Sequence, residues 1–545
     1  MTSSLDGLNQ LYFNSLLQEA HASTAQNRSP LRLYDPRVKD PERERLAYSA
    51  AIAPPELSAK IPVTSYQSLR THLSPLTNRA KNSCLWIKKM QAGTGSSLER
   101  KRFLAETRHQ SLDQICLGAK GTDLTIEIKK DENSRRVSLA EIQLLQAIHD
   151  HSQKIFGEVC IHDLVSDETL KSVEEIWNLP SWLDSKKTYL QIFSQTLGLS
   201  RSGRTIQAMI PTLDESRRIS FNRKAPGGHA LFAVDALRAA YLPNALPKTK
   251  LEIVSVIGNG EDLSSAPDAW MVDYMLEKKL PIVMITTDKT PIDLKGGQIS
   301  LVREPDGEIY VSIVEQAQAK EAGQLELFEQ LGLKVSADHR KAMFNTNMAL
   351  FNYGELVPRM IDLVNSVGET EFLKIIAPDL ISNWKEQTDS DGIVRKYLQL
   401  EGAMGSTLLN LDRYWRKKFH EPLVSFINVE QEYRTQFFSP IKTAFDFLIQ
   451  FHSDRFALDP KSMRLKNLNP KILPSANFED KFYQDVANIL EVFKGSSLKD
   501  LVDLHVKGLV DFSGVKLKGK VKVVNPRPTL QRISNGILEN QEVVI

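Results

Sequence analysis

Small residues follow an apolar run near residue 90. They read Ala92-Gly93-Thr94-Gly95-Ser96. Because these side chains are short, backbone N–H groups can approach a phosphate or a base without obstruction. The segment is therefore a candidate nucleotide loop, and a flexible turn is the alternative.

Carboxylates follow a second apolar run. Residues 253–257 are apolar except for Ser255 and lead into Asn259, Glu261 and Asp262. In open α/β sheets the ligand lies beyond the carboxyl ends of the strands. Mg²⁺ is commonly held by one or two carboxylates together with substrate phosphates. The segment is a candidate metal site, and a turn before a helix is the alternative.

Two further segments combine glycine with groups that bind anions. Residues 288–297 include Lys295 and Gly297, and residues 226–229 end in Gly228 and His229. A lysine neutralises phosphate, and the free N–H groups of a helix start attract anions. A hairpin turn and a helix start with a surface histidine are the alternatives. The joint order of the segments must therefore carry the interpretation.

Common catalytic motifs are absent from the sequence. It contains no HExxH, GxSxG or GxxxxGK[ST] pattern. His149 and His151 lie two apart on an expected helix, so they face different directions and are a poor metal pair.

The elements that must position these residues follow an α/β pattern. Four apolar runs are expected as strands, at 84–87, 159–161, 251–257 and 281–285. Helical spacing at 139–149 and 230–241 separates them. This alternation predicts an α/β domain with a mostly parallel sheet. Residues 298–302 and 309–314 flank a strong turn and predict an antiparallel hairpin.

Three parts are expected along the chain. Residues 1–80 form a peripheral, mostly helical extension, with one amphipathic helix near residues 8–16. Residues 81–475 form the α/β body that carries the candidate segments. Residues 476–545 form a small β-solenoid, because Gly508, Gly514 and Gly519 interrupt short apolar pieces at intervals of five or six residues.

The composition excludes several classes of protein. Lys and Arg number 69 against 67 Asp and Glu, a formal net charge of +2. This balance argues against a protein that coats nucleic acid or an anionic membrane. The sequence shows no uncharged apolar stretch of membrane-spanning length and no signal-peptide pattern. Three cysteines without a CxxC pair predict a reducing, cytoplasmic compartment.

Taken in order, the segments resemble the eukaryotic-type UTP–glucose-1-phosphate uridylyltransferases (UDP-glucose pyrophosphorylases). Residues 287–297 are similar to the family's T-D-K-T-R-x-D-x-K-G-G, with Pro291 in place of the arginine. Residues 344–347 are identical to its F-N-T-N. Further ordered matches are 313–318 (V-E-I-A-Q), 400–405 (L-E-T-A-x-G), 440–443 (P-V-K-T) and 515–521 (V-x-L-K-G-x-V). The resemblance runs from about residue 82 to the end.

The resemblance implies a Rossmann-like nucleotidyltransferase, with a mixed, mostly parallel sheet flanked by helices, and a C-terminal left-handed β-helix. It implies Mg²⁺-dependent conversion of UTP and glucose 1-phosphate to UDP-glucose and pyrophosphate by in-line attack, without a covalent intermediate. The implied partners are UTP and a hexose 1-phosphate, with no nucleic acid and no membrane. The C-terminal domain also offers a surface for homo-oligomer formation.

The resemblance also assigns residues to the two substrates. Uracil and phosphates would be bound by Ala92, Gly93, Gly95 and Ser96. Gly228 and His229 would contact the uridine or sugar part, and Asn259 would also bind substrate. The sugar would be bound by Lys295, Gly297, Glu315, Asn345 and Asn347. Lys120, in a Gly-Ala-Lys-Gly segment similar to the family's G-P-K, and Lys442 would act as catalytic lysines on the phosphates. Lys101 competes with Lys120, because it lies at about the family's spacing.

Departures from the family pattern leave alternatives open. Ala92 replaces a glycine, Glu99 stands where the family has a glycine, and the family's metal-binding aspartate falls on Glu261, with Asp262 beside it. A UDP-N-acetylhexosamine or broad UDP-sugar pyrophosphorylase is one alternative. A degenerate, non-catalytic UDP-sugar-binding protein is the other.

Overall fold

The computed structural model describes most of the chain after residue 61. The described residues are 62–72, 78–95, 98–130, 133–207, 209–215, 219–293, 296–303, 309–321, 325, 328, 343–388, 393–534 and 536–545. The helix expected near residues 8–16 lies outside them, as do Ser96 and Lys295.

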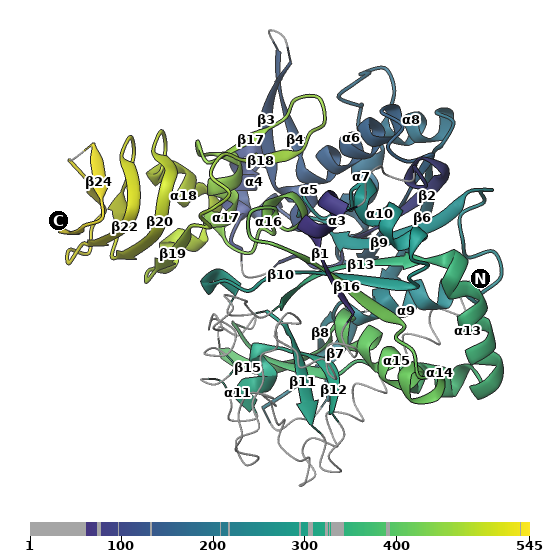
Figure 1. Cartoon of the computed structure of the whole chain (residues 1–545). Coiled ribbons are helices and arrows are strands. Elements are labelled where there is room, and N and C mark those ends of the chain that lie inside the picture. The colour runs from purple at the N-terminus through teal and green to yellow at the C-terminus, as the bar shows by residue number, and fades with distance from the viewer. Residues whose placement is uncertain are drawn as a thin grey trace.

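A mixed, mostly parallel sheet crosses the centre of the molecule (Figure 1). Its main path has the order β1-β16-β10-β13-β9-β2-β5-β6. Neighbours on this path are parallel, except that β13 is antiparallel to β10 and β9. The bounds are β1 Val63–Ser65, β2 Ser83–Met90, β5 Glu158–Ser166, β6 Leu199–Gln207, β9 Glu252–Asn259, β10 Ile282–Asp288, β13 Met343–Asn352 and β16 Val424–Val429. The four expected strands are confirmed as β2, β5, β9 and β10.

Alternate residues of the central strand β2 enter two separate cores. Leu85 and Ile87 belong to one core, whereas Cys84 and Trp86 belong to the other. Successive side chains of a strand point to opposite faces, so a strand covered on both faces is apolar at nearly every position. This explains the continuous apolar runs that predicted β9 and β10.

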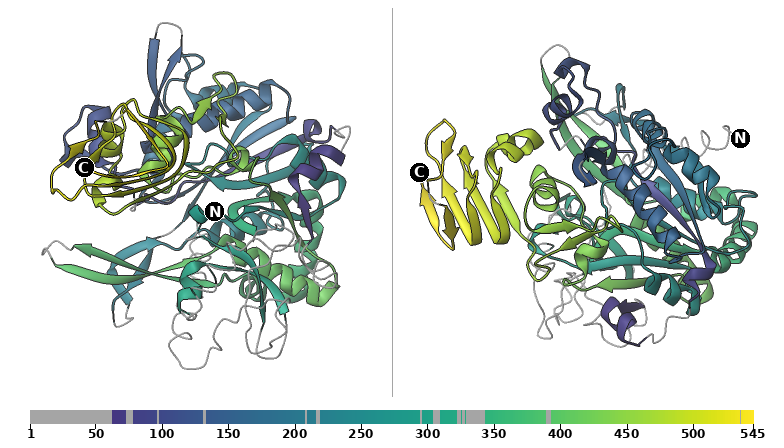
Figure 2. Two further views of the ribbon diagram at one scale, coloured as in Figure 1. Left: turned by 60° about the vertical axis from the view of Figure 1, so that its left-hand side comes forward. Right: turned by 90° about the horizontal axis from the view of Figure 1, so that it is seen from above.

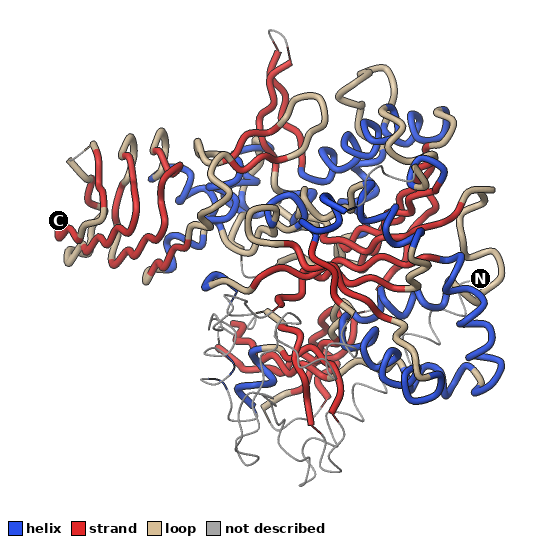
Figure 3. Tube along the Cα trace, viewed as in Figure 1, coloured by secondary structure: helices blue, strands red, loops and turns tan. Residues whose placement is uncertain are grey.

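Helices pack on both faces of this sheet (Figure 3). The first core includes residues of α6 (Leu139–Ser152) and α10 (Ala269–Glu277), and the second includes residues of α9 (Ala230–Ala239), α13 (Tyr353–Val367) and α15 (Met404–Phe419). Helix α6 starts with a capping box between Ser138 and Glu141, which satisfies N–H groups of its first turn. The two expected helices are confirmed as α6 and α9.

A smaller sheet and a hairpin lie below the central sheet in Figure 1. The sheet has the order β14-β15-β7-β8, with bounds β14 Leu380–Thr388, β15 Val394–Gly402, β7 Met209–Leu213 and β8 Ile219–Pro226. Strands β11 (Gln298–Arg303) and β12 (Ile309–Val314) pair antiparallel, which confirms the expected hairpin. The pair Gln298 and Phe344 joins this hairpin to β13.

Parallel strands stack one behind another in the C-terminal part (Figures 1 and 2). Strands β19 (Ser475–Phe478), β20 (Ser497–Lys507), β22 (Lys516–Val524), β24 (Ile537–Glu539) and β25 (Glu542–Val544) form one row. β21 (Val510–Asp511) and β23 (Gln531–Arg532) form a second. Gly508, Gly514 and Gly519 all have positive φ, a conformation that glycine adopts without strain. Gly508 and Gly514 lie in the turns on either side of β21, whereas Gly519 lies within β22.

The described part of the N-terminal region joins the main body. Strand β1 pairs with β16, and Tyr66 and Leu69 of α3 (Tyr66–His72) are buried in the first core. Further elements of the chain are α4 Lys101–Arg108, α5 Lys120–Asp123, α7 Leu170–Trp177, α16 Arg434–Phe437, β17 Phe456–Leu458 and α18 Val486–Val492. Within the described ranges, no helix is both long enough and apolar enough to span a membrane.

Candidate functional site

The candidate nucleotide loop and the candidate metal residues meet at one edge of the sheet. β2 and β9 are parallel neighbours, and their last residues, Met90 and Asn259, are paired. The Gly260 N–H donates to the Met90 carbonyl at 3.0 Å. A Cβ on Gly260 would lie only 2.7 Å from that carbonyl oxygen, so glycine permits this close approach. The carboxyl ends of the two strands therefore bring both loops together, as the position rule for such sheets predicts.

Lys120 lies between these two loops. Its Nζ is 2.6 Å from Glu261 Oε1 and donates to the Ile441 carbonyl at 2.9 Å. Its stem lies against the nucleotide loop, because a Cβ on Gly95 would be 2.5 Å from Lys120 Cδ. The competing residue, Lys101, is exposed at the start of α4. The geometry therefore favours Lys120 as the lysine of this site.

Glu261 and Asp262 have different surroundings. Asp262 is fully buried, and its two oxygens accept the N–H groups of Ser264 at 2.8 Å and Ser439 at 2.9 Å. Burial raises the Asp262 pKa to about 7. For Glu261, burial raises the pKa, but the Lys120 ammonium outweighs this and leaves it below its usual value. Glu261 is thus the ionised carboxylate facing the loop, while Asp262 links two backbone segments.

The segment 226–229 adds a third wall. The Gly402 N–H donates to the Gly227 carbonyl at 2.9 Å. Gly228 has φ +88°, and a Cβ there would lie 2.6 Å from the Gly402 carbonyl. His229 follows at the start of α9, is exposed, and lies in the electric field of both Glu261 and Lys120. We call residues 91–95, Lys120, Gly228, His229 and Glu261 the nucleotide half of the site.

Gln207 of β6 is a neighbour of this half that the sequence did not indicate. Its Nε2 donates to the Gly228 carbonyl at 2.8 Å, and its side chain is buried. A single glutamine at the end of a strand has no local sequence signature, so its contact with Gly228 can be identified only from the structure.

Four residues expected around the sugar also lie together. The Asn345 N–H donates to the Gly297 carbonyl at 2.9 Å, and Asn345 Nδ2 donates to Asn347 Oδ1 at 2.8 Å. A Cβ on Gly297 would be 2.5 Å from Glu315 Oε1. Asn347 has φ +58° beside a register shift between β10 and β13, a conformation that asparagine tolerates better than most residues. We call these four residues the sugar half.

Charged groups surround Glu315. Burial raises its pKa to about 7, with Glu401 adding to the rise and with Lys442 and Lys289 opposing it. Lys442 is exposed, and its Nζ lies 5.3 Å from the centre of the Phe344 ring. Because the preceding residue, Ile441, accepts the hydrogen bond from Lys120, this segment connects the two halves.

A buried ion pair supports the sugar half from behind. Arg434 of α16 donates to both oxygens of Asp293, at 2.6 and 2.8 Å, and both side chains are buried. Asp293 also accepts from the Thr290 N–H at 3.0 Å and from the Thr290 hydroxyl at 2.7 Å. Asp293 belongs to the motif at residues 287–297, but Arg434 lies 141 residues later and no local sequence pattern points to it.

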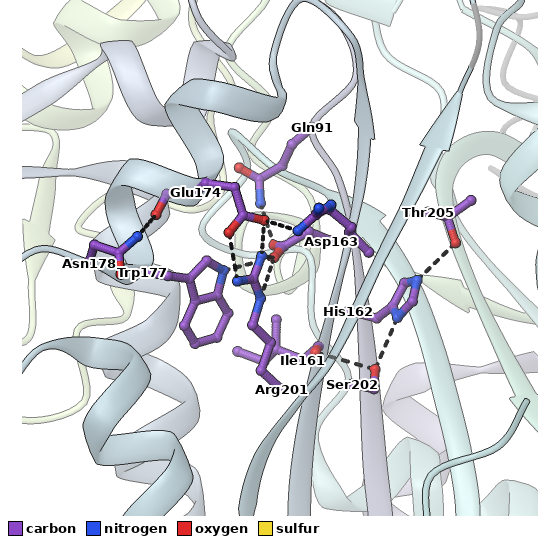
Figure 4. A network of polar contacts seen from close by, with 11 residues as sticks. Gln91, Ile161, His162, Asp163, Glu174, Trp177, Asn178, Arg201, Ser202 and Thr205 are labelled. Carbon is purple, nitrogen blue, oxygen red and sulfur yellow. Dashed lines mark hydrogen bonds and ion pairs between the residues drawn. The ribbon is translucent and has the colours of Figure 1, made fainter. Parts of the chain in front are cut away.

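A polar network supports the nucleotide half (Figure 4). Gln91 Nε2 donates to Asp163 at 3.2 Å, and the indole N–H of Trp177 donates to the same carboxylate at 2.7 Å. Arg201 joins Asp163 to Glu174, at 2.9 and 2.7 Å. Gln91, the residue just before the loop, is thus tied to β5, β6 and α7.

Other expected residues have backbone roles at the same edge. The Ala92 carbonyl accepts from the Ser166 hydroxyl at 2.6 Å, and the Asn259 N–H donates to the Ser265 hydroxyl at 3.0 Å. Gly93 is exposed. Glu99 is exposed too, and its backbone pairs with Asp485 rather than closing over the loop. The expected Ser96 and Lys295 fall outside the described residues.

Protein comparisons agree with the resemblance. The family model for UTP--glucose-1-phosphate uridylyltransferase matches residues 191–518, more than half of the chain. The enzyme of that name from Solanum tuberosum is 27% identical over 324 residues, 58% of this chain and 58% of its own length. The one from Saccharomyces cerevisiae is 27% identical over 432 residues, 78% of this chain and 74% of its own. The chain therefore spans a little over half the length of the potato relative.

Solved structures match a larger share of the chain. A UDP-glucose phosphorylase from Trypanosoma brucei aligns with a TM-score of 0.62 at 20% identity, covering 90% of this chain and 91% of its own. A UDP-glucose pyrophosphorylase mutant from Leishmania major in complex with UDP-glucose aligns with a TM-score of 0.62 at 21% identity and the same coverages. These two matches establish the shared fold. By the match over residues 191–518, the chain belongs to the UTP--glucose-1-phosphate uridylyltransferase family.

Proposed function

We propose that this protein transfers a uridylyl group from UTP to glucose 1-phosphate and releases pyrophosphate. The observation that carries the proposal is the meeting of Lys120, Glu261 and the loop 92–95 at one sheet edge, beside the sugar half. Family membership and the relatives' names support the same reaction. In this proposal the substrates are UTP and a hexose 1-phosphate, with no role for nucleic acid or a membrane.

The proposed chemistry needs positioning and charge neutralisation. Backbone N–H groups of the loop hold uracil and phosphates, while Lys120 and Lys442 neutralise the triphosphate. An oxygen of the sugar phosphate attacks the α-phosphorus in line. The new P–O bond forms as the bond from the α-phosphorus to the bridging oxygen breaks, and the electron pair leaves with pyrophosphate. No protein nucleophile is needed.

Mg²⁺ is part of this proposal, and Glu261 is the residue that would hold it. Its carboxylate is ionised, and Mg²⁺ needs only one or two carboxylates when phosphates supply further oxygens. Within the described ranges, no group of three or more His, Cys, Asp or Glu side chains forms a ready-made metal cage. When bound, the ion would neutralise phosphate charge.

Glu261→Gln tests the metal assignment. We expect it to lower Mg²⁺-dependent turnover about 100-fold, because the amide carries no charge. Asp262→Asn disturbs a hydrogen-bonded turn and should lower thermal stability more than the response to Mg²⁺. The measurement is initial rate against Mg²⁺ concentration for both variants. The reverse ranking of the two variants would move the proposed ligand to Asp262.

The finer architecture is also proposed. The stacked parallel strands β19, β20, β22 and β24, with their second row, support a left-handed β-helix such as the family resemblance implies. Its last strands offer a surface for a homo-oligomer. The three cysteines are free thiols, which fits the cytoplasmic location expected from the sequence.

One assay tests the reaction and its alternatives. Purified protein receives UTP and Mg²⁺ with either glucose 1-phosphate or N-acetylglucosamine 1-phosphate, and pyrophosphate release is followed. Release with glucose 1-phosphate is expected. Release with the N-acetyl substrate alone would favour the hexosamine alternative, and release with both would favour a broad UDP-sugar enzyme. No release with any sugar phosphate would leave the non-catalytic binding protein as the better hypothesis.

A further inference from the structure

A buried arginine lies behind the nucleotide half and has no expected role from the sequence. The side chains of Arg100 and Asp123 both have an exposed fraction of 0%, and Arg100 Nε donates to Asp123 Oδ2 at 2.9 Å. Long charged side chains are rarely this buried unless they are paired. Removing charges from water costs free energy, so a buried pair of this kind adds little to the stability of the fold by itself.

Arg100 holds the backbone on one side of the site. Its guanidinium donates to the carbonyls of Gly95 at 3.4 Å and Leu98 at 3.3 Å. Gly95 belongs to the nucleotide loop, and its φ of +65° is one that few other residues adopt easily. The arginine thereby fixes the end of that loop.

The same guanidinium holds the backbone on the other side. It donates to the Gly118 carbonyl at 3.0 Å, and Asp123 accepts the Gly118 N–H at 2.9 Å. Gly118 lies two residues before Lys120, and Asp123 is the last residue of the helical turn that Lys120 begins. The Arg100–Asp123 pair therefore fixes the segment that carries Lys120 on both sides of the lysine, at Gly118 and at Asp123.

These contacts set one distance that matters for the chemistry. The Lys120 stem lies against Gly95, so the loop and the lysine must keep a fixed separation. We infer that Arg100 is a positioning residue for uridylyl transfer, which holds the nucleotide loop and Lys120 in register through Asp123. This inference rests on the proposed function.

The test compares Arg100→Lys with Asp123→Asn. Lysine keeps the charge but lacks the planar fork that reaches several carbonyls, and asparagine keeps the shape without the charge. We expect each variant to raise KM for UTP and so to lower kcat/KM for UTP roughly tenfold to 100-fold, since small misplacements of reacting groups cost about this much. KM for glucose 1-phosphate should change little. An equal rise in both KM values would overturn the inference.

Arg455→Lys is the matched control. Arg455, the residue just before β17, is another fully buried arginine. It donates hydrogen bonds to the carbonyls of Lys499, Asn469 and Ile472. Its replacement should lower thermal stability without raising KM for UTP above KM for glucose 1-phosphate in relative terms. If Arg455→Lys produces the same selective rise in KM for UTP, the effect of Arg100→Lys reflects general loosening and the inference is wrong.

A double variant tests whether Arg100 acts through Lys120. Contacting residues that work as a unit are not additive, whereas independent losses add. In the Lys120→Ala background, Arg100→Lys should lower kcat/KM by only about twofold to threefold. A full additive loss contradicts the inference.

A measurement of UTP binding distinguishes a failure of the positioning role of Arg100 from a failure of the proposed reaction. Calorimetry with UTP measures affinity whether or not turnover occurs. Absence of turnover in the wild-type protein sinks the proposed reaction, and weaker UTP binding by Arg100→Lys and Asp123→Asn would still support the positioning role. Unchanged UTP affinity in both variants would overturn that role.

Discussion

In the nucleotide half, Arg100 and Asp123 join two loops, whereas in the sugar half Arg434 joins Asp293 of one loop to helix α16. The first arginine spreads its donors over three carbonyls and one carboxylate. Arg434 instead donates two hydrogen bonds to the Asp293 carboxylate and one to the Asp288 carbonyl. The nucleotide loop and Lys120 lie before the family match, and the sugar half lies within it. Gly228, His229 and Glu261 of the nucleotide half lie within the match, so the Arg100 support holds the part of that half that precedes it.

The two halves also hold their carboxylates in different states. Lys120 keeps the pKa of Glu261 below its usual value, whereas burial raises the pKa of Glu315 to about 7. Glu261 is therefore ionised across the physiological range, and Glu315 changes protonation within it. In the proposed reaction a permanent charge at Glu261 would suit a centre that binds phosphates and Mg²⁺. A carboxyl near its pKa can accept or donate a hydrogen bond to a sugar hydroxyl.

The largest effect is expected from the lysine of the nucleotide half. Lys120→Ala removes a cation from a developing polyanionic centre and should lower kcat by about 100- to 1000-fold. Lys101→Ala is the matched control, because Lys101 is exposed on α4 and should be close to wild type. Steady-state rates at saturating UTP decide the matter. An inactive Lys101→Ala with a normal Lys120→Ala would reassign the phosphate-binding lysine.

An intermediate effect is expected from the sugar half. Arg434→Lys keeps the charge next to Asp293 but loses the two-pronged contact, so the loop 288–297 should shift. We expect KM for glucose 1-phosphate to rise roughly tenfold to 100-fold while KM for UTP stays near its normal value. This is the mirror image of the result for Arg100→Lys. If both arginine variants raise the same KM, the two halves do not work as separate supports.

The sequence predicted the strands of the sheet better than the supports of the site. β9 and β10 were identifiable because residues buried on both faces form continuous apolar runs. Lys120 and Glu261 could be brought together from the resemblance and from the rule that ligands lie beyond the carboxyl ends of strands. Strand β13, by contrast, was noticed only as a motif at 344–347, and its antiparallel direction had no local signal.

The buried arginines could not be identified from sequence for a physical reason. Arg100 and Asp123 are 23 residues apart, and Arg434 and Asp293 are 141 apart. A pair across such separations has no period, no turn signature and no fixed spacing. In the sequence, Arg100 stands in the charged run Glu99-Arg100-Lys101-Arg102, which is typical of an exposed helix start. Only the fold shows that Arg100 is buried while its two neighbours are exposed.

The smallest effect is expected in the pH dependence of stability. A carboxyl whose folded pKa is raised favours folding at low pH, and this contribution is lost as pH rises from the unfolded value toward the folded one. For Glu315 that window runs from 4.5 to about 7. The free energy of unfolding of the wild type, minus that of Glu315→Gln, should therefore fall by at most about 3 kcal/mol across it.

Glu261→Gln gives the opposite profile and serves as the control. The Glu261 pKa is lowered, so its contribution is present above 4.5 and is lost only as the pH falls below that value. Urea unfolding of the three proteins between pH 5 and 8, without substrates, measures both differences. We expect a slope for Glu315→Gln and a flat line for Glu261→Gln. Two flat lines would mean that Glu315 is not held near its protonation midpoint, and the electrostatic contrast between the halves would then disappear.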